Sequence, residues 1–241
     1  MRSARAHFDS QLSNLRDQLL RMGSLVDEAL DGAIRALVER DSELATRVIR
    51  GDETINRLRY AIEEQSYLLL ATQQPMAGDL RRIAAAISIA TNMERMADHA
   101  TGIAVLARRL NNEPEVKPPA DILRMAEVTR TMLRRALDAY LTTDAALARE
   151  VAAEDEEINQ LHEQVLRKLV GDMIEDPQST RRNTYLLWVA HNLERWGDRI
   201  KNICERVVYA ATGELTDFDA HAESEGELDE HDALADPLDN L

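Results

Sequence analysis

The chain has 241 residues, of which 44% are hydrophobic but only 4% aromatic, and its formal net charge is −15. Nine glycines, six prolines and no β-branched or aromatic runs exclude a strand-rich fold, and the acidic balance argues against nucleic-acid binding. A single cysteine, Cys204, excludes an internal disulfide and a cysteine zinc cage, and the absence of a long apolar segment predicts a cytoplasmic protein that spans no membrane.

The first half of the chain predicts three helices. Apolar residues recur every three or four positions between residues 8 and 39, as on one face of a helix. Asp41 is a suitable N-cap for a second helix that runs to about residue 72. The segment QQPMAGD at 73–79 ends that helix, and a third is expected from about 78 to 111.

The same order of elements follows in the second half. The segment NNEPEVKPP at 111–119 is the best linker candidate because it holds three of the six prolines. Helices are then expected at about 120–142, at 144–175 after a cap at Asp144, and at 181–211 after the break EDPQST.

Literal repetition links the two halves. With an offset of 103, nine residues of 41–58 reappear in 144–161; with an offset of 100, eight residues of 81–103 reappear in 181–203. We therefore predict an all-α protein of two tandem, pseudo-symmetric three-helix bundles with six long helices, divided into residues 1–113 and 114–213.

Residues 214–241 differ from the rest of the chain. They hold eleven acidic residues and no lysine or arginine, so they carry most of the net charge. Such a composition cannot bury enough apolar surface to order itself, and we expect a disordered tail. Two roles are considered for this tail: it solubilises the protein, or it binds a partner.

The third helix of each repeat contains one pair of acids. Glu94 and Asp98 lie four residues apart, and so do Glu194 and Asp198. This spacing places like charges on one helix face, which is destabilising unless a cation lies between them. The second helix of each repeat offers supporting oxygen atoms at the same spacing, from Asp52, Asn56, Asp155 and Asn159.

These acids have two interpretations. Arginines neutralise them in the first, namely Arg95 and Arg195 or the pairs at 81–82 and 181–182. In the second they bind a hard cation, because oxygen-only ligands suit Mg, Mn or Fe better than zinc. A ferritin-type di-iron site is not indicated, since Glu-x-x-His does not occur in the chain.

Four segments resemble the PhoU family, which is associated with the phosphate-specific ABC transporter and the phosphate-starvation two-component system. They are RVIRGDETINRL (47–58), QQPMAGDLRRI (73–83), NMERMADHATGI (92–103) and HNLERWGDRIKNICERVVYAATGE (191–214). The resemblance spans residues 8–214 and leaves the acidic tail outside. It implies paired three-helix bundles, a homodimer, and a di- or trivalent ion (Mg, Mn, Fe or Zn) at Glu94/Asp98 and Glu194/Asp198.

The resemblance also implies a function. Family members are negative regulators of phosphate uptake that contact the transporter ATPase and the sensor histidine kinase. No nucleotide-binding loop or nucleophile motif is present, so enzyme activity is not expected. The alternatives are a carboxylate-bridged helical metalloenzyme and a metal-free helical adaptor.

The two acidic motifs differ at one position. Family motifs often read Glu-Arg-x-Gly-Asp, which the second copy keeps with Gly197, whereas the first copy has Ala97. Because glycine permits close backbone approach, this difference favours the second copy as the more open site.

Overall fold

The computed structural model describes residues 2–115 and 117–218, and within these ranges it contains helices and no strand. The order is α1 (Arg2–Val38), α2 (Ser42–Gln73), α3 (Gly78–Leu110), α4 (Ala120–Thr142), α5 (Ala145–Ala153), α6 (Asp155–Glu175), a 3₁₀ turn (Pro177–Ser179) and α7 (Thr180–Thr212). The predicted all-α class is confirmed. None of the described helices is both long and apolar enough to cross a bilayer. The predicted acidic tail lies almost wholly outside the described residues.

Equivalent caps start the second helix of both repeats. The Asp41 carboxylate accepts hydrogen bonds from the backbone N–H groups of Glu43 and Leu44, and Asp144 accepts them from Ala146 and Leu147. Each cap satisfies two amides that have no partner within the helix. The predicted helix starts at these two positions are confirmed, 103 residues apart.

The helix expected over 144–175 is divided in two, which the periodicity did not predict. α5 ends at Ala153 and α6 begins at Asp155, with Glu154 between them. Arg135 of α4 forms an ion pair with the Glu154 carboxylate. Asp155 then turns inward and is only 3% exposed. Contacts from neighbouring helices, rather than a proline or glycine, therefore accompany the interruption.

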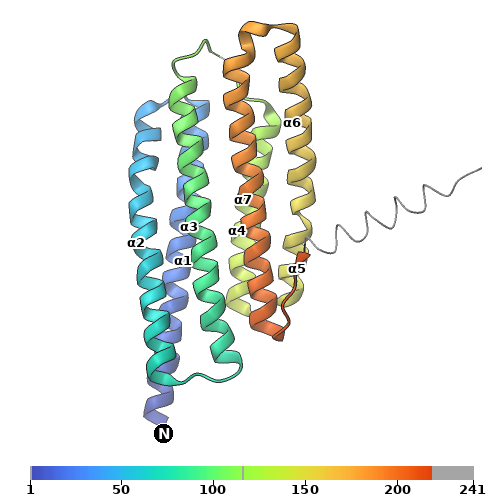
Figure 1. The fold of residues 1–241 in the computed structure, drawn as a ribbon. Helices are drawn as coiled ribbons and strands as arrows, with labels where there is room; N and C mark the ends of the chain where they lie inside the picture. Colours follow the sequence, from blue (N-terminus) through green and yellow to red (C-terminus); the bar gives the residue numbers. More distant parts are fainter. Residues whose placement is uncertain (1, 116, 219–241) are drawn as a thin grey trace, which may run out of the picture.

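The two repeats lie side by side with their helices nearly parallel or antiparallel (Figure 1). α1, α2 and α3 form one group, and α4 to α7 form the other. α3 packs on α7 and α1 packs on α4 across the seam between them. The buried apolar residues of both repeats belong to one continuous core. In that core the Trp196 indole Nε1 donates a 2.6 Å hydrogen bond to the Met96 carbonyl, at equivalent positions of the two repeats.

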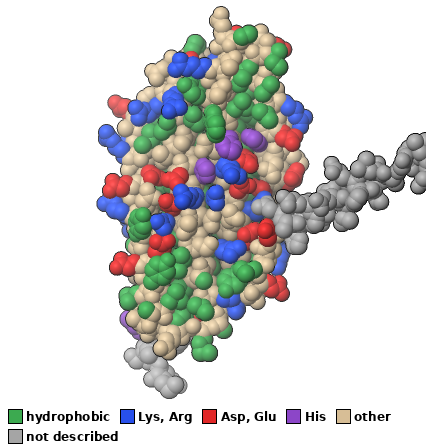
Figure 2. Space-filling view, in the orientation of Figure 1, with side chains coloured by type: hydrophobic (Ala, Val, Ile, Leu, Met, Phe, Trp, Pro, Cys, Tyr) green, Lys and Arg blue, Asp and Glu red, His purple; other side chains and the backbone are tan. Residues whose placement is uncertain are grey.

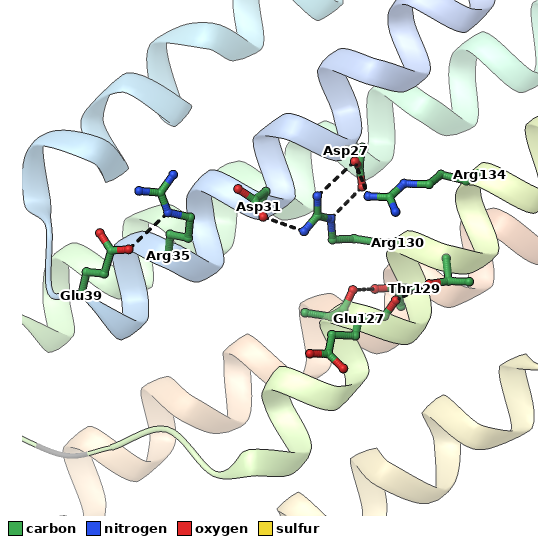
Figure 3. Close-up of polar contacts among 10 residues, drawn as sticks. Asp27, Asp31, Arg35, Glu39, Glu127, Thr129, Arg130 and Arg134 are labelled. Carbon is green, nitrogen blue, oxygen red and sulfur yellow. Dashed lines mark hydrogen bonds and ion pairs between the residues drawn. The ribbon is translucent and has the colours of Figure 1, made fainter.

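A group of ion pairs joins α1 to α4 at the seam (Figure 3). The Arg130 guanidinium lies 2.7 Å from Asp27 Oδ1 and 2.6 Å from Asp31 Oδ1, and Arg134 lies 2.9 Å from Asp27 Oδ2. Burial acts to raise the pKa of Asp27, but hydrogen bonds and charge from the two arginines outweigh it and lower that pKa. These contacts fix how the first repeat meets the second.

Candidate functional site

Helices α2 and α3 bring together the four residues predicted for the first acidic cluster. The Asn56 amide Nδ2 donates a 2.9 Å hydrogen bond to Asp52 Oδ2. Asp98 of α3 is close enough to Asp52 to act on its ionisation, and Asp52 in turn acts on Glu94. We call these residues, Asp52, Asn56, Glu94 and Asp98, the first cluster.

The negative charge of the first cluster is incompletely balanced. Burial raises the pKa of Asp52, and the Asp98 carboxylate raises it further. Burial and Asp98 likewise raise the pKa of Glu94, against the lowering effect of Arg95 and Arg59. The Glu94 side chain is only 17% exposed. Desolvation and mutual repulsion thus both disfavour the charged carboxylates here.

Arg95 provides part of the compensation, from the same helix as the acids. Its Nε lies 3.6 Å from Glu94 Oε2, and its Nη1 lies 3.3 Å from Asp98 Oδ2. The Arg95 side chain is 59% exposed, and ion pairs of such exposed groups are weak. The other arginines considered for this role are directed elsewhere: Arg82 pairs with Asp79, Arg181 with Glu113 and Arg182 with Asp176.

The second acidic pair lies on α7 in a related arrangement. Arg195 Nη1 lies 2.9 Å from Asp198 Oδ2, and His191 Nδ1 lies 3.6 Å from Glu194 Oε2. Burial raises the pKa of Glu194, as do Asp198 and, to a lesser degree, Asp155. Glu194, Asp198 and Asp155 are called the second cluster. Asn159 is exposed on α6 and forms no hydrogen bond with these acids in the described part of the chain.

A lysine inside the second cluster was missed in the sequence. Lys201 Nζ lies 3.1 Å from Asp155 Oδ2, and both side chains are largely buried. Lys201 also lowers the pKa of Glu194. At the offset of 100, its counterpart in the first repeat is Thr101, whose hydroxyl contacts Asp52. Comparison of the repeats at this position would have shown that the second repeat has a lysine where the first has a threonine.

The difference between Gly197 and Ala97 has a packing explanation. A Cβ added to Gly197 would lie 2.5 Å from Asp155 Oδ1 and 2.9 Å from Ile158 Cδ1. The space left by the glycine is therefore filled by the start of α6. The glycine allows α6 to approach α7 closely, and it does not leave the second cluster more open than the first, contrary to the expectation from the motif.

The donor atoms fit a hard cation, although they form no complete coordination shell. Buried oxygens without a hydrogen-bond donor are present in both clusters, at Asn56 Oδ1 and Glu194 Oε2. Carboxylate and amide oxygens are ligands for Mg²⁺, Mn²⁺ and iron. Over residues 2–115 and 117–218, however, no three His, Cys, Asp or Glu side chains are placed to hold one ion.

The first cluster lies on α2 and α3 and the second on α6 and α7, and these four helices form the broad face turned to the viewer in Figure 1. Figure 2 shows acidic, basic and histidine side chains gathered across the middle of this face, with hydrophobic side chains above and below. His99 of α3 lies 3.1 Å from Asn192 Oδ1 of α7, and His191 stacks edge-on against Trp188. His99 thus links the two repeats, whereas His191 contacts Trp188 within α7.

Known proteins match this chain along most of its length. A model of the PhoU domain matches residues 19–107 and 122–207. A "phosphate-specific transport system accessory protein PhoU homolog" of Pseudomonas putida is 39% identical over 207 residues, covering 86% of this chain and 81% of that protein. The protein of the same description from Aquifex aeolicus is 36% identical over 217 residues, covering 90% and 98% of the two chains.

Solved structures show the same fold. The crystal structure of PhoU from Pseudomonas aeruginosa has a TM-score of 0.82 at 35% identity and covers 86% of this chain and 100% of that chain. The phosphate transport system regulatory protein PhoU from Streptococcus pneumoniae has a TM-score of 0.82 at 34% identity, with coverage of 88% and 100%. Two domain matches, extended sequence identity and a shared fold lead to one conclusion: the chain belongs to the PhoU family.

Proposed function

We propose that this protein is a cytoplasmic negative regulator of phosphate uptake and of phosphate-starvation signalling. The relatives are named as accessory or regulatory proteins of a phosphate transport system. The observation that supports this role most is that both repeats match the PhoU domain and each carries an acidic cluster. The proposed partners are the phosphate transporter ATPase and the sensor histidine kinase.

The first cluster is the better candidate for a metal centre. In it, Asp52, Glu94 and Asp98 repel one another without a buried lysine, whereas Lys201 neutralises part of the second cluster. A divalent or trivalent ion (Mg, Mn, Fe or Zn) would be held by Glu94 and Asp98, with Asp52 and Asn56 as supporting oxygens. Because the three carboxylates are not already placed around one point, their side chains would have to move together to hold it. Bound there, the ion supplies positive charge that offsets their desolvation and repulsion. Glu194 and Asp198, with Asp155, form the second and weaker candidate.

Exposed apolar side chains provide contacts for partner proteins. Tyr60, Tyr67 and Leu68 of α2 are more than half exposed, and so is Trp188 of α7. Single exposed apolar residues are ordinary, but Tyr60 and Tyr67 lie seven residues apart on one face of α2, with Leu68 beside them, and such a group favours a docking surface. We propose that this surface serves the ATPase, the kinase or the second subunit of a homodimer.

The test is reconstitution with the transporter ATPase and the kinase from the same organism. We expect stable binding to at least one of them and a lower rate of phosphate uptake or kinase signalling. A variant with Tyr67→Glu and Leu68→Glu should lose binding while keeping its helical spectrum. A double substitution at exposed positions of α4 and α6, Thr131→Glu and Gln164→Glu, adds the same two negative charges and is the control.

Two results would contradict this function. Turnover of a phosphate ester or of oxygen by the metal-loaded protein would favour a metalloenzyme. If the protein takes up no metal and binds the ATPase or the kinase without changing phosphate transport or signalling, a simple helical adaptor is favoured.

A further inference from the structure

A small, partly open cavity lies at the seam between the repeats and shares no lining residue with either acidic cluster. Its volume is about 170 Å³, which leaves room for more than one water molecule or for a small ion. α1 contributes Asp9, Ser13 and Arg16 to its lining, α3 contributes Arg82, and α4 contributes Tyr140. The cavity therefore joins two helices of the first repeat to one of the second.

Two guanidinium groups converge on a buried hydroxyl in this cavity. Tyr140 is only 5% exposed. Burial raises its pKa to about 12, while the charges of Arg16 and Arg82 act in the opposite direction. The phenol is thus a neutral hydroxyl at physiological pH, and it can donate a hydrogen bond alongside the two arginines.

The arginines are incompletely balanced by acids. Arg16 is partly buried, and in the described part of the chain no carboxylate forms an ion pair with it. Arg82 Nη1 lies 3.6 Å from Asp79 Oδ1, which is a loose pair. Asp9 is exposed and is the one carboxylate among the residues that line the cavity. Two guanidinium groups and two hydroxyls, from Ser13 and Tyr140, line the cavity with it.

We propose that this cavity binds a small tetrahedral oxyanion, with inorganic phosphate as the ligand. Arginine offers planar pairs of N–H donors that match the oxygens of phosphate, and the hydroxyls supply further donors. A ligand held by α1, α3 and α4 at once ties the two repeats together at their seam. This site is independent of the proposed metal centres, since it shares no residue with them.

The experiment is calorimetric titration of the chelator-treated, full-length protein with sodium phosphate at constant ionic strength, maintained with chloride. We expect saturable binding of one phosphate per chain and a rise in the melting temperature with phosphate concentration. Arg16→Gln and Arg82→Gln should each weaken binding roughly tenfold or more, because each removes charge-assisted hydrogen bonds. Tyr140→Phe should weaken it by a smaller factor.

The matched control is Arg57→Gln, which removes the same charge from an exposed ion pair of α2. It should bind phosphate as the unmodified protein does. Unchanged binding in the folded Arg16→Gln and Arg82→Gln variants, or no saturable binding to the metal-free protein, would overturn the proposal. Phosphate binding seen only after metal loading would assign the anion to the acidic clusters. That result would support the proposed metal centres and overturn the proposed anion site at the seam.

Discussion

One pair of equivalent residues changes the charge balance of the two acidic clusters. Lys201 contributes an ammonium group beside Asp155, whereas Thr101 contributes only a hydroxyl beside Asp52. Burial raises the pKa of a carboxylate that has no counter-charge, and an external cation can supply the missing charge. The repeats therefore share their acids but differ in the positive charge placed beside them.

The substitution Thr101→Lys tests this difference. A lysine there would place a cation beside Asp52, as Lys201 does beside Asp155, and it should replace the ion proposed for the first cluster. For the unmodified, chelator-treated protein, Mn²⁺ at a hundred times its dissociation constant should stabilise by about 2.7 kcal/mol, or roughly 5–10 °C in melting temperature. The variant should lose most of that rise in a thermal melt.

Two further variants define the result. Thr131→Lys adds the same charge on an exposed face of α4 and should keep the metal-dependent rise. Glu94→Gln with Asp98→Asn should abolish it while the apo protein stays folded. An unmodified protein that does not respond to metal would mean that Arg95 and its neighbours already satisfy the acids.

The ion pairs between α1 and α4 predict a pH dependence of stability. The folded-state pKa of Asp27 is lowered, so its contribution is present above the unfolded-state pKa of about 3.9 and is lost as pH falls through the folded value. Asp27→Asn should therefore cost about 1–2 kcal/mol in free energy of unfolding at pH 7. Urea denaturation at several pH values should show that the cost shrinks below about pH 4.

Glu28→Gln is the neighbouring control. Glu28 is exposed on the same helix, and its removal should change the free energy of unfolding by less than about 0.5 kcal/mol. A loss in Asp27→Asn that stays constant with pH would show that the carboxylate charge is not what holds the seam.

At the scale of the elements, the sequence predicts most helices because their signals are local. Caps at Asp41 and Asp144 and the proline-containing breaks mark the boundaries, and the structure confirms them. The interruption at Glu154 was not predicted, because residues around it are good helix formers. It accompanies contacts of Arg135 and Gly197, which are distant in the sequence.

The substitution Gly197→Ala tests that tertiary cause. The new methyl group would meet Asp155 Oδ1 at 2.5 Å and Ile158 Cδ1 at 2.9 Å, so these two buried side chains, or α6 with them, must shift. We expect a loss of about 1–3 kcal/mol in the free energy of unfolding, measured by urea denaturation. Gly171→Ala on α6 is the control; its Cβ meets nothing within 4 Å, and it should stabilise by up to about 1 kcal/mol. An equal gain in the free energy of unfolding in both variants would show that α6 does not approach α7 closely at Gly197.

At the scale of the molecule, spacing predicts which residues share a face but not which faces meet. The acids of the first cluster were predicted because Asp52/Asn56 and Glu94/Asp98 each follow helical spacing. Lys201 and the seam cavity were not predicted. The cavity brings together Arg16, Arg82 and Tyr140 from three helices, and no local pattern specifies how these helices pack. The sequence predicts the two repeats, but it does not predict that they share one core, because that depends on how their helices pack.

That shared core predicts that neither repeat folds alone. α3 and α7 bury their apolar faces against each other, and Trp196 reaches the Met96 carbonyl across the seam. A fragment of residues 1–113 or 114–213 would expose this surface to water, which costs about 25 cal/mol per Å² of apolar area. Each fragment expressed alone should therefore aggregate or lack a cooperative melt by circular dichroism. Co-expressed fragments should form a one-to-one complex with a single transition, and cooperative melting of either isolated fragment as a monomer would show that the repeats are independent domains.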